Sequence, residues 1–569
     1  MKTELLLGDE AVGLAAIDAR IAGAFSYPGT PATEILEFIA ARTAGCGSVH
    51  ALWSANEKVA YEEALGMSYA GRRAIVSMKH VGLNVAADPF VNSALTGVNG
   101  GLVLAVADDP GMHSSQNEQD SRYLAEFARI PVLEPSNQQE CYDFTREAFE
   151  LSERLGLPVM VRLVTRLAHS RALVRVADSD SERAPRRDPL PLPDKRDWTL
   201  IPANARRRFQ RLLDIQPAVQ EFSERFPFNR LTLAGRHGII ASGIAYNYVR
   251  EVLADDGGPE GMDAGAVEHS AGRGERFAGA AWPTLLKICT YPVPRNLVRE
   301  LVNHCDEITV VEEGYPFIES RLNGLLGLPG RSVRGKLTGA LPAAGELTPD
   351  SVALALGKKS PGAGPPAGDL PPRPPSLCKG CPHADTFRAI LDATRGYPGA
   401  ILFSDIGCYT LACLPPLEAV HSCVDMGASI SMAHGATQAG RFPVLCTIGD
   451  STFTHSGMTP LIGAARVDAD MTVFILDNAT VAMTGGQPTM AAGEELLRLL
   501  KGLGVREDHL HVIEPLPRNH SENVELIARA INHRGLSVIV SRRACVQIRK
   551  PTATGAREEQ SAPVAAAGR

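Results

Sequence analysis

Phe442-Pro-Val-Leu-Cys-Thr-Ile-Gly449-Asp450 and Met471-Thr-Val-Phe-Ile-Leu-Asp477-Asn478 are the two stretches that decide the fold of this 569-residue chain. Each is an apolar, β-branched run typical of a buried strand, and each ends in polar residues. Residues 457–467 between them have the pattern of a helix. In a right-handed strand–helix–strand unit both strands end at the same edge of the sheet, which is the edge where ligands bind. We therefore expect Asp450 and Asn478 to converge there.

The side chains of Asp450 and Asn478 offer the ligands that Mg²⁺ prefers. This ion takes about six oxygens, usually one or two from the protein and the rest from water and substrate phosphates. Gly449 would let a diphosphate approach the backbone, and the helix after it would offer free N–H groups to the anion. A capping Asp and an Asn with left-handed backbone would give the same short pattern in a turn without any ligand. The short pattern alone therefore leaves both interpretations open.

Apolar segments of about four to eight residues alternate with helix-like stretches along most of the chain, which indicates an α/β fold with parallel sheets. The clearest strands are expected at 74–78, 101–107, 131–134, 158–164, 238–241, 284–289 and 307–311, and a helix at 139–155. We predict three doubly wound α/β domains, at residues 1–176, 231–358 and 377–549. The other segments are expected to be a linker over 177–230, a mobile insertion over 255–279, a proline-rich linker over 359–376 and a disordered tail over 550–569.

The composition is that of a soluble globular protein. Hydrophobic residues make up 44% and charged residues 21%, no apolar run is long enough to span a membrane, and no export signal is readable, so we expect a cytoplasmic protein. The net charge of −7 argues against a nucleic-acid partner, and the basic cluster at 206–208 fits a solvated helix face. The eleven cysteines are expected to be reduced core residues. Only Cys378 and Cys381 have metal-ligand spacing, and with His383 they fall short of the four ligands of a closed zinc site.

Two longer strings place the polar strand ends in a known context. Gly449-Asp-Ser-Thr-Phe-Thr-His-Ser-Gly457 and Ile475-Leu-Asp-Asn-Ala-Thr-Val-Ala-Met-Thr-Gly-Gly-Gln-Pro488 closely resemble the large (alpha) subunit of indolepyruvate:ferredoxin oxidoreductase, a thiamine diphosphate enzyme of the 2-oxoacid:ferredoxin oxidoreductase family. The resemblance covers nearly the whole chain. It implies a pyrimidine-binding domain first, a transketolase-C-like domain second and a diphosphate-binding domain third. It also implies that Asp450, Asn478 and the backbone carbonyl of Thr480 hold Mg²⁺.

Further strings of the third domain match the family and would surround the cofactor. They are Cys378-Lys-Gly-Cys381-Pro-His383, in which Lys379 replaces a proline of the family, Ser404-Asp405-Ile-Gly407-Cys408, and Asp425-Met-Gly427-Ala-Ser429. The cofactor-binding residues that the resemblance implies in this domain are Cys381, His383, Asp405, Gly407, Cys408, Gly427, Ser429, Gly449, Asp450, Ser451, Asn478, Met483 and Thr484.

The first domain would supply the catalytic groups. The family carries the glutamate that activates the aminopyrimidine ring in a string that matches residues 53–71, which implies this role for Glu57. An exposed helix glutamate is the alternative. The string from Tyr27 to Glu34 resembles the family's substrate-facing turn, in which Thr30 would hydrogen-bond a 2-oxoacid. Thr30 would equally well serve as the N-cap of a helix with Pro31 at its first position.

A second group of residues in the first domain matches a loop that faces the cofactor in the family. Lys79, His80 and Asn84 would there bind the substrate carboxylate or stabilise developing charge, although His80 alone fits a satisfied loop histidine equally well. The polar run over 108–122 follows a buried strand and matches the family nearly letter for letter. Loops in that position often carry function.

The chemistry that the resemblance implies is decarboxylation of a 2-oxoacid. Ferredoxin-linked members of the family carry a C-terminal module of clustered cysteines for [4Fe–4S] clusters, whereas this chain has only Cys545 after Asn478, so we expect no iron–sulfur cluster in this chain. The first hypothesis is oxidation of an aryl 2-oxoacid, such as indolepyruvate or phenylpyruvate, to acyl-coenzyme A, with electrons passed to a small (beta) subunit or another acceptor. The second is a non-oxidative decarboxylase or carboligase, and the third is a catalytically silent scaffold subunit. Because two chains pair around the cofactor in the family, we also expect a dimer.

Overall fold

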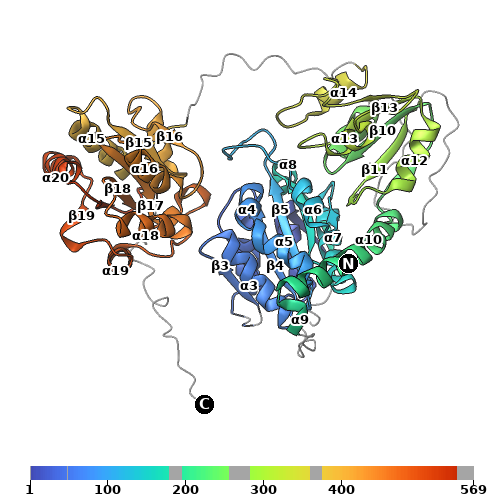
Figure 1. The fold of residues 1–569 in the computed structure, drawn as a ribbon. Helices are drawn as coiled ribbons and strands as arrows, with labels where there is room; N and C mark the ends of the chain where they lie inside the picture. Colours follow the sequence, from blue (N-terminus) through green and yellow to red (C-terminus); the bar gives the residue numbers. More distant parts are fainter. Residues whose placement is uncertain are drawn as a thin grey trace. The chain divides into compact units, whose positions relative to one another are not determined.

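The computed structural model describes residues 2–45, 47, 49–177, 195–254, 282–358 and 375–547. The chain forms two compact units, unit 1 over Met1–Pro371 and unit 2 over Pro372–Arg569. Figure 1 shows both, with unit 1 in blue to yellow and unit 2 in orange to red. The mobile insertion expected at 255–279, the disordered tail expected at 550–569 and most of the proline-rich linker lie outside the described residues. Among the described helices, none combines the length and the apolar character needed to cross a bilayer.

The first sheet of unit 1 has seven strands in the order β12-β6-β7-β5-β4-β2-β3, and all neighbours are parallel except β12 and β6. The predicted strands and helix are confirmed as β4 (Ala74–Lys79), β5 (Leu102–Asp108), β6 (Val132–Leu133), β7 (Val159–Val164) and α7 (Gln138–Leu155). The sequence patterns did not identify β2 (Gly23–Ser26) and β3 (His50–Trp53), which are only four residues long. The other elements around this sheet are α1 (Gly8–Asp18), α2 (Thr33–Thr43), α3 (Glu57–Tyr69), α4 (His80–Val85), α5 (Ala87–Thr96), α6 (Ser121–Ala128), α8 (Thr165–His169), and the antiparallel pair β1 (Lys2–Leu7) and β8 (Arg171–Val176).

The second sheet of unit 1 has the order β14-β13-β10-β11-β9. The predicted strands are confirmed as β10 (His237–Ser242), β11 (Thr284–Ile288) and β13 (Glu307–Val311), and β9 (Arg230–Thr232) and β14 (Ser332–Arg334) complete the sheet. Helices α11 (Ala245–Ala254), α12 (Arg295–His304), α13 (Phe317–Asn323) and α14 (Pro349–Ala355) accompany it. Directly after β11 the chain crosses to the first sheet, where β12 (Thr290–Tyr291) pairs with β6. Because β11 belongs to the second sheet and β12, which follows it, belongs to the first, the two predicted domains form a single unit.

The interval 177–230, which we expected to be a linker, contains a long helix. Residues 178–194 lie outside the described part, but α9 (Lys195–Trp198) and α10 (Pro202–Arg225) follow them. The expectation of a solvated basic face at 206–208 is wrong for Arg208, which is buried and donates from Nε to the carbonyl of Leu95 over 2.8 Å. At the other end of α10, Ser223 donates to the carbonyl of Pro292 over 2.6 Å. Helix α10 therefore packs against α5 and the end of β12, because Arg208 and Ser223 find carbonyl acceptors there.

A buried ion network also joins the two sheets of unit 1. Arg162, on β7, contacts Asp108 through Nε at 2.7 Å and also pairs with Glu134. Arg122, on α6, contacts Asp120 at 2.5 Å and reaches Glu312 of the second sheet at 2.8 Å. All of these side chains are almost completely buried. The polar run 108–122 thus contributes to the packing of unit 1, in addition to any role in the site.

Unit 2 contains one parallel six-stranded sheet in the order β16-β15-β17-β18-β20-β19. The two strands that open the sequence analysis are confirmed as β17 (Val444–Gly449) and β18 (Thr472–Asp477), and the helix between them as α18 (Met458–Arg466). The remaining strands are β15 (Ile401–Ser404), β16 (Ser422–Cys423), β19 (Leu510–Ile513) and β20 (Ser537–Arg542). The helices are α15 (Pro382–Thr394), α16 (Ala428–Gln438), α17 (Asp450–Thr452), α19 (Gly493–Gly502) and α20 (His520–Asn532). The predicted α/β class with parallel sheets is confirmed.

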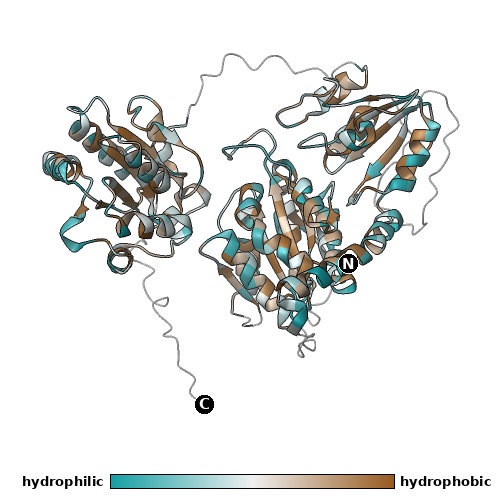
Figure 2. Cartoon of the chain, in the orientation of Figure 1, coloured by the Kyte–Doolittle hydropathy of each residue, from teal (hydrophilic) through white to brown (hydrophobic). Residues whose placement is uncertain are grey.

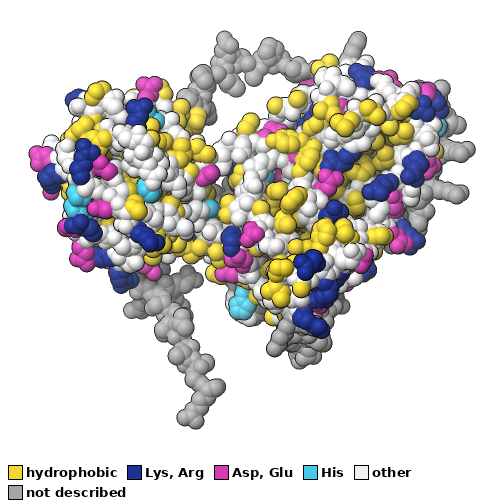
Figure 3. Space-filling view, in the orientation of Figure 1, with side chains coloured by type: hydrophobic (Ala, Val, Ile, Leu, Met, Phe, Trp, Pro, Cys, Tyr) yellow, Lys and Arg dark blue, Asp and Glu magenta, His cyan; other side chains and the backbone are white. Residues whose placement is uncertain are grey.

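Apolar residues predominate in the strands, and polar residues predominate on the outer faces of the helices. In Figure 2 the strands are largely brown, while the outer faces of helices such as α12 and α20 are teal. On the face drawn in Figure 3, acidic and basic side chains are interspersed on both units. The ten cysteines among the described residues are all free, and five of them are buried. Both features agree with a weakly charged chain that is held together without disulfide bonds.

Candidate functional site

The carboxyl ends of β17 and β18 carry the polar side chains that the sequence predicted to converge. Asp450 is the first residue of α17, and its Oδ2 accepts a hydrogen bond of 2.7 Å from the backbone N–H of Ala479, next to Asn478. Its Oδ1 accepts a second one of 2.7 Å from the N–H of Ser451. The predicted convergence of Asp450 and Asn478 is therefore observed. A π-helical turn (η3, Phe453–Gly457) interrupts the helix that Asp450 begins, and such turns are frequent at functional sites.

Asp450 is buried, and the groups that shift its pKa most include no lysine or arginine. Only 2% of it is exposed, and burial raises its pKa to about 7, with the nearby Asp477 adding to the shift. The carboxylate of Asp477 contacts Arg542 at 3.1 Å, whereas the groups that lower the pKa of Asp450 most are backbone N–H groups. A buried carboxylate of this kind favours a bound cation. The donor set of a carboxylate with a neighbouring amide oxygen fits Mg²⁺.

The loop after β18 brings the other two predicted metal ligands to the same place. Ala479 has a left-handed backbone, with φ of +61°, and turns the chain over Asp450. The Oδ1 of Asn478 accepts from the N–H of Thr480 over 3.2 Å, and Thr480 is itself buried. The side-chain amide of Asn478 lies 3.3 Å from Nε2 of His383. These contacts fix Asn478 with its amide nitrogen toward His383 and its oxygen on the side of the Thr480 backbone.

His383 and Cys381 border this edge, as predicted. Cys381 is the N-cap of α15, and His383 lies in the first turn of that helix. Burial lowers the pKa of His383 to about 4, so its ring is neutral at pH 7. A neutral imidazole accepts a hydrogen bond from an amide without repelling a cation bound nearby. His383 therefore suits a positioning role beside Asn478.

Gly407 and Gly449 both lie against the ring of Tyr409. A Cβ at Gly449 would lie 2.8 Å from Cε1 of Tyr409, and a Cβ at Gly407 would lie 2.3 Å from the same atom. The ring of Tyr409 is buried and fills the space beside both residues. The structure thus gives a packing reason for glycine at position 449, and the approach of a diphosphate to its backbone stays a prediction.

Asp405, Gly427 and Ser429 form one hydrogen-bonded group. Asp405 accepts from the N–H of Gly427 over 2.7 Å, from the N–H of Ser429 over 3.3 Å and from the hydroxyl of Ser429. Burial raises its pKa to about 6 in spite of these donors. Gly427 has φ of +100°, and a Cβ there would lie 2.5 Å from Cβ of Ser456, so the position requires glycine. This carboxyl group positions the start of α16.

Ser451, Met483 and Thr484 lie around the same loop with unequal burial. Ser451 is buried and follows Asp450 in α17. Thr484 donates its hydroxyl to Oε1 of Gln487 over 2.6 Å, which closes the loop 480–487 on itself. Met483 is 59% exposed. The structure therefore gathers Ser451 and the loop near Asp450, but leaves the Met483 side chain open to solvent.

Sequence spacing missed a group of four cysteines in unit 2. Cys408 has a pKa raised to about 11 by burial and by its neighbours Cys381, Cys545 and Cys378. The N–H of Cys545 donates to the carbonyl of Asn478 over 3.3 Å, which places this group beside the metal-ligand loop. No three of these four described thiols lie close enough to one another to hold one metal ion. The fold nevertheless brings Cys545 into the neighbourhood of cysteines from earlier segments, which counting along the sequence does not show.

The pyrimidine half of the predicted site lies in unit 1. Glu57 is the first residue of α3 and is 4% exposed, so the alternative of an exposed helix glutamate is wrong. A Cβ at Gly82, on α4, would lie 2.7 Å from Oε1 of Glu57, so the helices approach each other where glycine leaves room. Lys79 is buried, and burial lowers its pKa, while the charges of Asp109 and Glu57 oppose that shift. The charge of Glu57 therefore acts on Lys79 in a largely buried environment.

Thr30 lies next to Lys79 through a shared neighbour. Ser114 donates its hydroxyl to the carbonyl of Thr30 over 3.2 Å, and its own carbonyl accepts from Nζ of Lys79 over 3.2 Å. The alternative in which Thr30 caps a helix is wrong, because α2 begins at Thr33 with Ala32 as its N-cap. The hydroxyl of Thr33 instead accepts from the N–H of Gly29 over 3.0 Å. The structure therefore brings Thr30, Lys79 and Glu57 into one region of unit 1.

His80 and Asn84 face a pocket on the other side of α4. Residues two apart on a helix point in different directions, which separates His80 and Asn84 from Gly82 and Glu57. The pocket has a volume of about 500 Å³ and is lined by His80, Asn84, Gln119, Asp120, Ser121, Tyr123, Leu124 and Tyr315. His80 is buried, its Nε2 lies 3.1 Å from the carbonyl of Asn117, and its Nδ1 has no hydrogen-bond partner among the described residues. The interpretation of His80 as a fully satisfied loop histidine therefore fails for one ring nitrogen.

Comparison with known proteins identifies both halves of this arrangement. A family model described as pyruvate flavodoxin/ferredoxin oxidoreductase, thiamine diphosphate-binding, matches residues 14–212, and the C-terminal thiamine pyrophosphate-binding domain of thiamine pyrophosphate enzymes matches residues 405–541. Indolepyruvate oxidoreductase subunit IorA of Archaeoglobus fulgidus is 36% identical, with 95% of this chain and 86% of the relative aligned. The IorA subunits of Pyrococcus abyssi and Methanothermobacter marburgensis are each 37% identical, over 96% and 95% of this chain and 86% of each relative.

Proposed function

The chain belongs to the family of indolepyruvate oxidoreductase IorA subunits, and from this premise we propose that it carries out the thiamine diphosphate-dependent oxidative decarboxylation of an aryl 2-oxoacid to acyl-coenzyme A. The observation that carries the proposal is the buried, uncompensated carboxylate of Asp450 beside Asn478 at the strand ends of unit 2. Asp450, Asn478 and the carbonyl of Thr480 would hold Mg²⁺ and, through it, a diphosphate.

The residues of unit 1 would perform the acid–base chemistry. When bound, thiamine diphosphate supplies the carbanion that attacks a 2-oxo carbon and the electron sink for loss of CO₂. The carboxylate of Glu57 would hold a proton at the aminopyrimidine ring, and its burial against Gly82 keeps water away from that proton. Lys79 would bind the carboxylate of the substrate, and Thr30 would orient it by a hydrogen bond. Buried charges act more strongly on a substrate than exposed ones do.

The pocket beside α4 supports an aromatic substrate. Two of its lining residues are Tyr123 and Tyr315, whose rings lie 6.1 Å apart, and Leu124 adds a third apolar group. His80 and Asn84 offer polar atoms on the same wall. A few polar groups among apolar and aromatic ones are the usual lining of a small-molecule site. Tyr123→Ala should therefore raise the KM for phenylpyruvate more than the KM for pyruvate.

The route of the electrons decides between oxidative and non-oxidative chemistry. We propose that electrons leave the chain for a small (beta) subunit or another acceptor, and that the catalytic form contains two copies of this chain.

An anaerobic assay of the full chain tests the proposal. The chain is supplied with thiamine diphosphate, Mg²⁺, coenzyme A and phenylpyruvate or indolepyruvate, and CO₂, aldehyde and acyl-coenzyme A are followed with and without an artificial electron acceptor. Acyl-coenzyme A that depends on the acceptor is the expected result. Aldehyde formed without an acceptor would establish the non-oxidative enzyme. If no turnover is seen even after the partner subunit is added, the result would favour the catalytically silent scaffold subunit.

Substitution of Glu57 tests the assigned proton carrier. Glu57→Gln keeps the shape of the side chain and should lower turnover by about 10²–10⁴-fold, the usual contribution of general acid–base catalysis. Binding of thiamine diphosphate with Mg²⁺, followed by fluorescence quenching, should persist. Glu62→Gln on the exposed side of the same helix, where Glu62 pairs with Lys58, is the matched control and should keep full turnover. Full turnover of Glu57→Gln would refute the assignment.

A further inference from the structure

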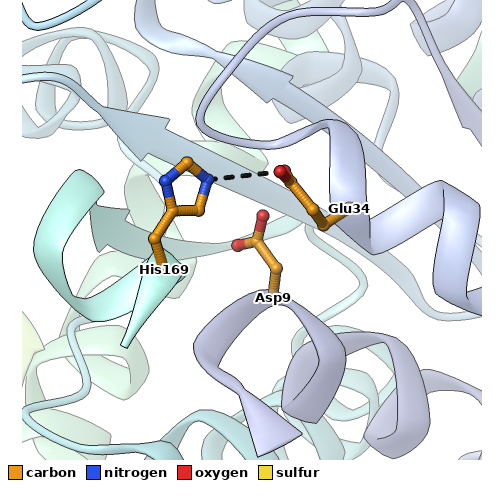
Figure 4. A group of neighbouring side chains, drawn as sticks. All are labelled: Asp9, Glu34 and His169. Atoms are coloured by element: carbon orange, nitrogen blue, oxygen red, sulfur yellow. Dashed lines mark ion pairs between the residues drawn. The ribbon is translucent and has the colours of Figure 1, made fainter. Parts of the chain in front are cut away.

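Three side chains of unit 1 that the proposed chemistry does not use form a compact cluster. They are Asp9 in the first turn of α1, Glu34 in the first turn of α2 and His169 at the end of α8. Their nearest ligand atoms all lie within 4.8 Å of one another, and Nε2 of His169 lies 3.5 Å from Oε2 of Glu34. Figure 4 shows the carboxylate of Asp9 directed into the space between the other two side chains.

Asp9 is the unusual member of this cluster. It is 0% exposed, and as a carboxylate it accepts no hydrogen bond from the described residues, whereas in its protonated form it would donate to Glu34. Burial raises its pKa well above the usual range, and the negative charges of Glu34 and Glu10 add to the shift. The groups that shift this pKa most include no lysine or arginine. A buried carboxylate without a partner is strongly unfavourable, unless it binds a proton or a cation.

The neighbours of Asp9 favour a metal ion. Glu34 and His169 are each 34% exposed, which leaves an open side for an ion to enter and for water to complete its coordination. One imidazole and two carboxylates, with water in the remaining positions, are ligands that Zn²⁺ and Mn²⁺ accept. With a neutral imidazole the three ligands carry two negative charges, which a divalent cation balances.

We propose that Asp9, Glu34 and His169 bind a divalent transition-metal ion of the Zn²⁺ or Mn²⁺ kind, at a site separate from the one assigned to Mg²⁺ in unit 2. The ion would join three segments that are distant in the sequence. Gly8 already brings α1 and α8 together, since a Cβ there would lie 2.3 Å from the carbonyl oxygen of Leu167. Glu34 follows closely after Thr30, so the ion would also fix the turn that carries Thr30.

Titration of the full chain with Mn²⁺, followed by electron paramagnetic resonance, tests the proposal. Mn²⁺ is the probe because soft thiolates, such as those of the four cysteines, bind it poorly. Thiamine diphosphate is left out, and the wild type is compared with Asp9→Asn, which removes the charge and keeps the shape. The wild type should bind one more Mn²⁺ per chain than Asp9→Asn. Mn²⁺ should also raise the melting temperature of the wild type more than that of Asp9→Asn. His520→Gln is the matched control, since His520 pairs with Asp392 at 2.9 Å without a third ligand, and it should bind as the wild type does.

A second variant guards against misfolding of Asp9→Asn. His169→Gln changes a partly exposed ligand and should lower the affinity for Mn²⁺ by at least about tenfold without loss of folding. The affinity of the wild type should also rise with pH, because the ion displaces protons from its ligands. Equal numbers of bound Mn²⁺ in the wild type, Asp9→Asn and His169→Gln would overturn the proposal. In that case Asp9 is a protonated acid that shares its proton with Glu34.

Discussion

Buried carboxyl groups stand at strand ends in both units, but the two units compensate their charges differently. In unit 1, Asp108 and Asp120 lie against the guanidinium groups of Arg162 and Arg122, which the chain itself supplies. In unit 2, the carboxylate of Asp450 accepts hydrogen bonds from the N–H groups of Ser451 and Ala479 and has no cation among the groups that shift its pKa most. In the first arrangement the chain itself supplies the cations, while in the second the proposed Mg²⁺ would supply one from outside.

The difference separates structural acids from functional ones. A carboxylate that is paired inside the chain stabilises the packing of the elements around it, and its loss is expected to unfold them. A buried carboxylate that is left unpaired costs stability until its cation binds, so its presence has to be explained by what it binds. By this criterion Asp120 belongs to the fold, even though it lies in a string that matches the family, and Asp450 belongs to the site.

Removal of a buried cation from unit 1 should have the largest effect. Arg162→Met leaves Asp108 and Glu134 buried without their partner and is expected to lower the free energy of unfolding by roughly 3–5 kcal/mol. Chemical denaturation followed by circular dichroism measures the change. Arg154→Met is the control, because Arg154 pairs with Glu147 at exposed positions and should contribute about 0–1 kcal/mol. If both substitutions lowered the free energy of unfolding equally, the buried ion pairs of unit 1 would contribute no more to stability than exposed pairs do.

Acidification should act in opposite directions on Asp405 of unit 2 and on Asp120 of unit 1. Burial raises the pKa of Asp405 in unit 2 to about 6 from 3.8, so its stabilising contribution is fully present below pH 3.8 and is lost as the pH rises through about 6. Arg122 and Arg162 lower the pKa of Asp120 in unit 1 against the effect of burial, so its contribution is present above pH 3.8 and is lost as the pH falls further. Unit 2 should gain on the order of 3 kcal/mol between pH 7 and pH 4 through Asp405.

Hydrogen exchange resolved by peptide measures the two units separately across this pH range. Peptides of β15 and α16 should become better protected as the pH falls from 7 to 4, and Asp405→Asn should flatten that change. Peptides of α6 and β7 should lose protection only below pH 3.8. Parallel loss of protection in both units on acidification would contradict the opposite signs of the two shifts.

Neutralisation of Asp450 should have the smallest effect on the unliganded chain. Asp450→Asn removes an uncompensated buried charge, so the free energy of unfolding should change by no more than about 1 kcal/mol, or rise. The same substitution should weaken Mg²⁺-dependent binding of thiamine diphosphate by at least about tenfold. Thermal unfolding with and without both ligands measures the two effects. Strong destabilisation of the unliganded chain would place Asp450 with the structural acids of unit 1.

Most of the confirmed predictions of the fold rest on long apolar runs and on the polar residues that end them. The strands over 444–449 and 472–477 were found because a buried parallel strand reads as a continuous apolar segment, and the convergence of Asp450 and Asn478 followed from the handedness of the connection. The four-residue strands β2 and β3 were missed, because so few residues establish no pattern. Helix α10 was taken for part of a linker, because its exposed, arginine-rich face hides the few buried positions that attach it to unit 1.

The sequence by itself determined the α/β class, the family, and the residues at the ends of β17 and β18. Local patterns suffice for these features, because a strand and the turn after it are encoded by consecutive residues. The tertiary structure alone decided which buried acids have partners, that Tyr409 fills the space beside Gly449, that Cys545 joins three cysteines of other segments, and that Asp9 faces Glu34 and His169. The physical reason is that the cost of a buried charge depends on what surrounds it in space, and residues far apart in the chain provide those surroundings.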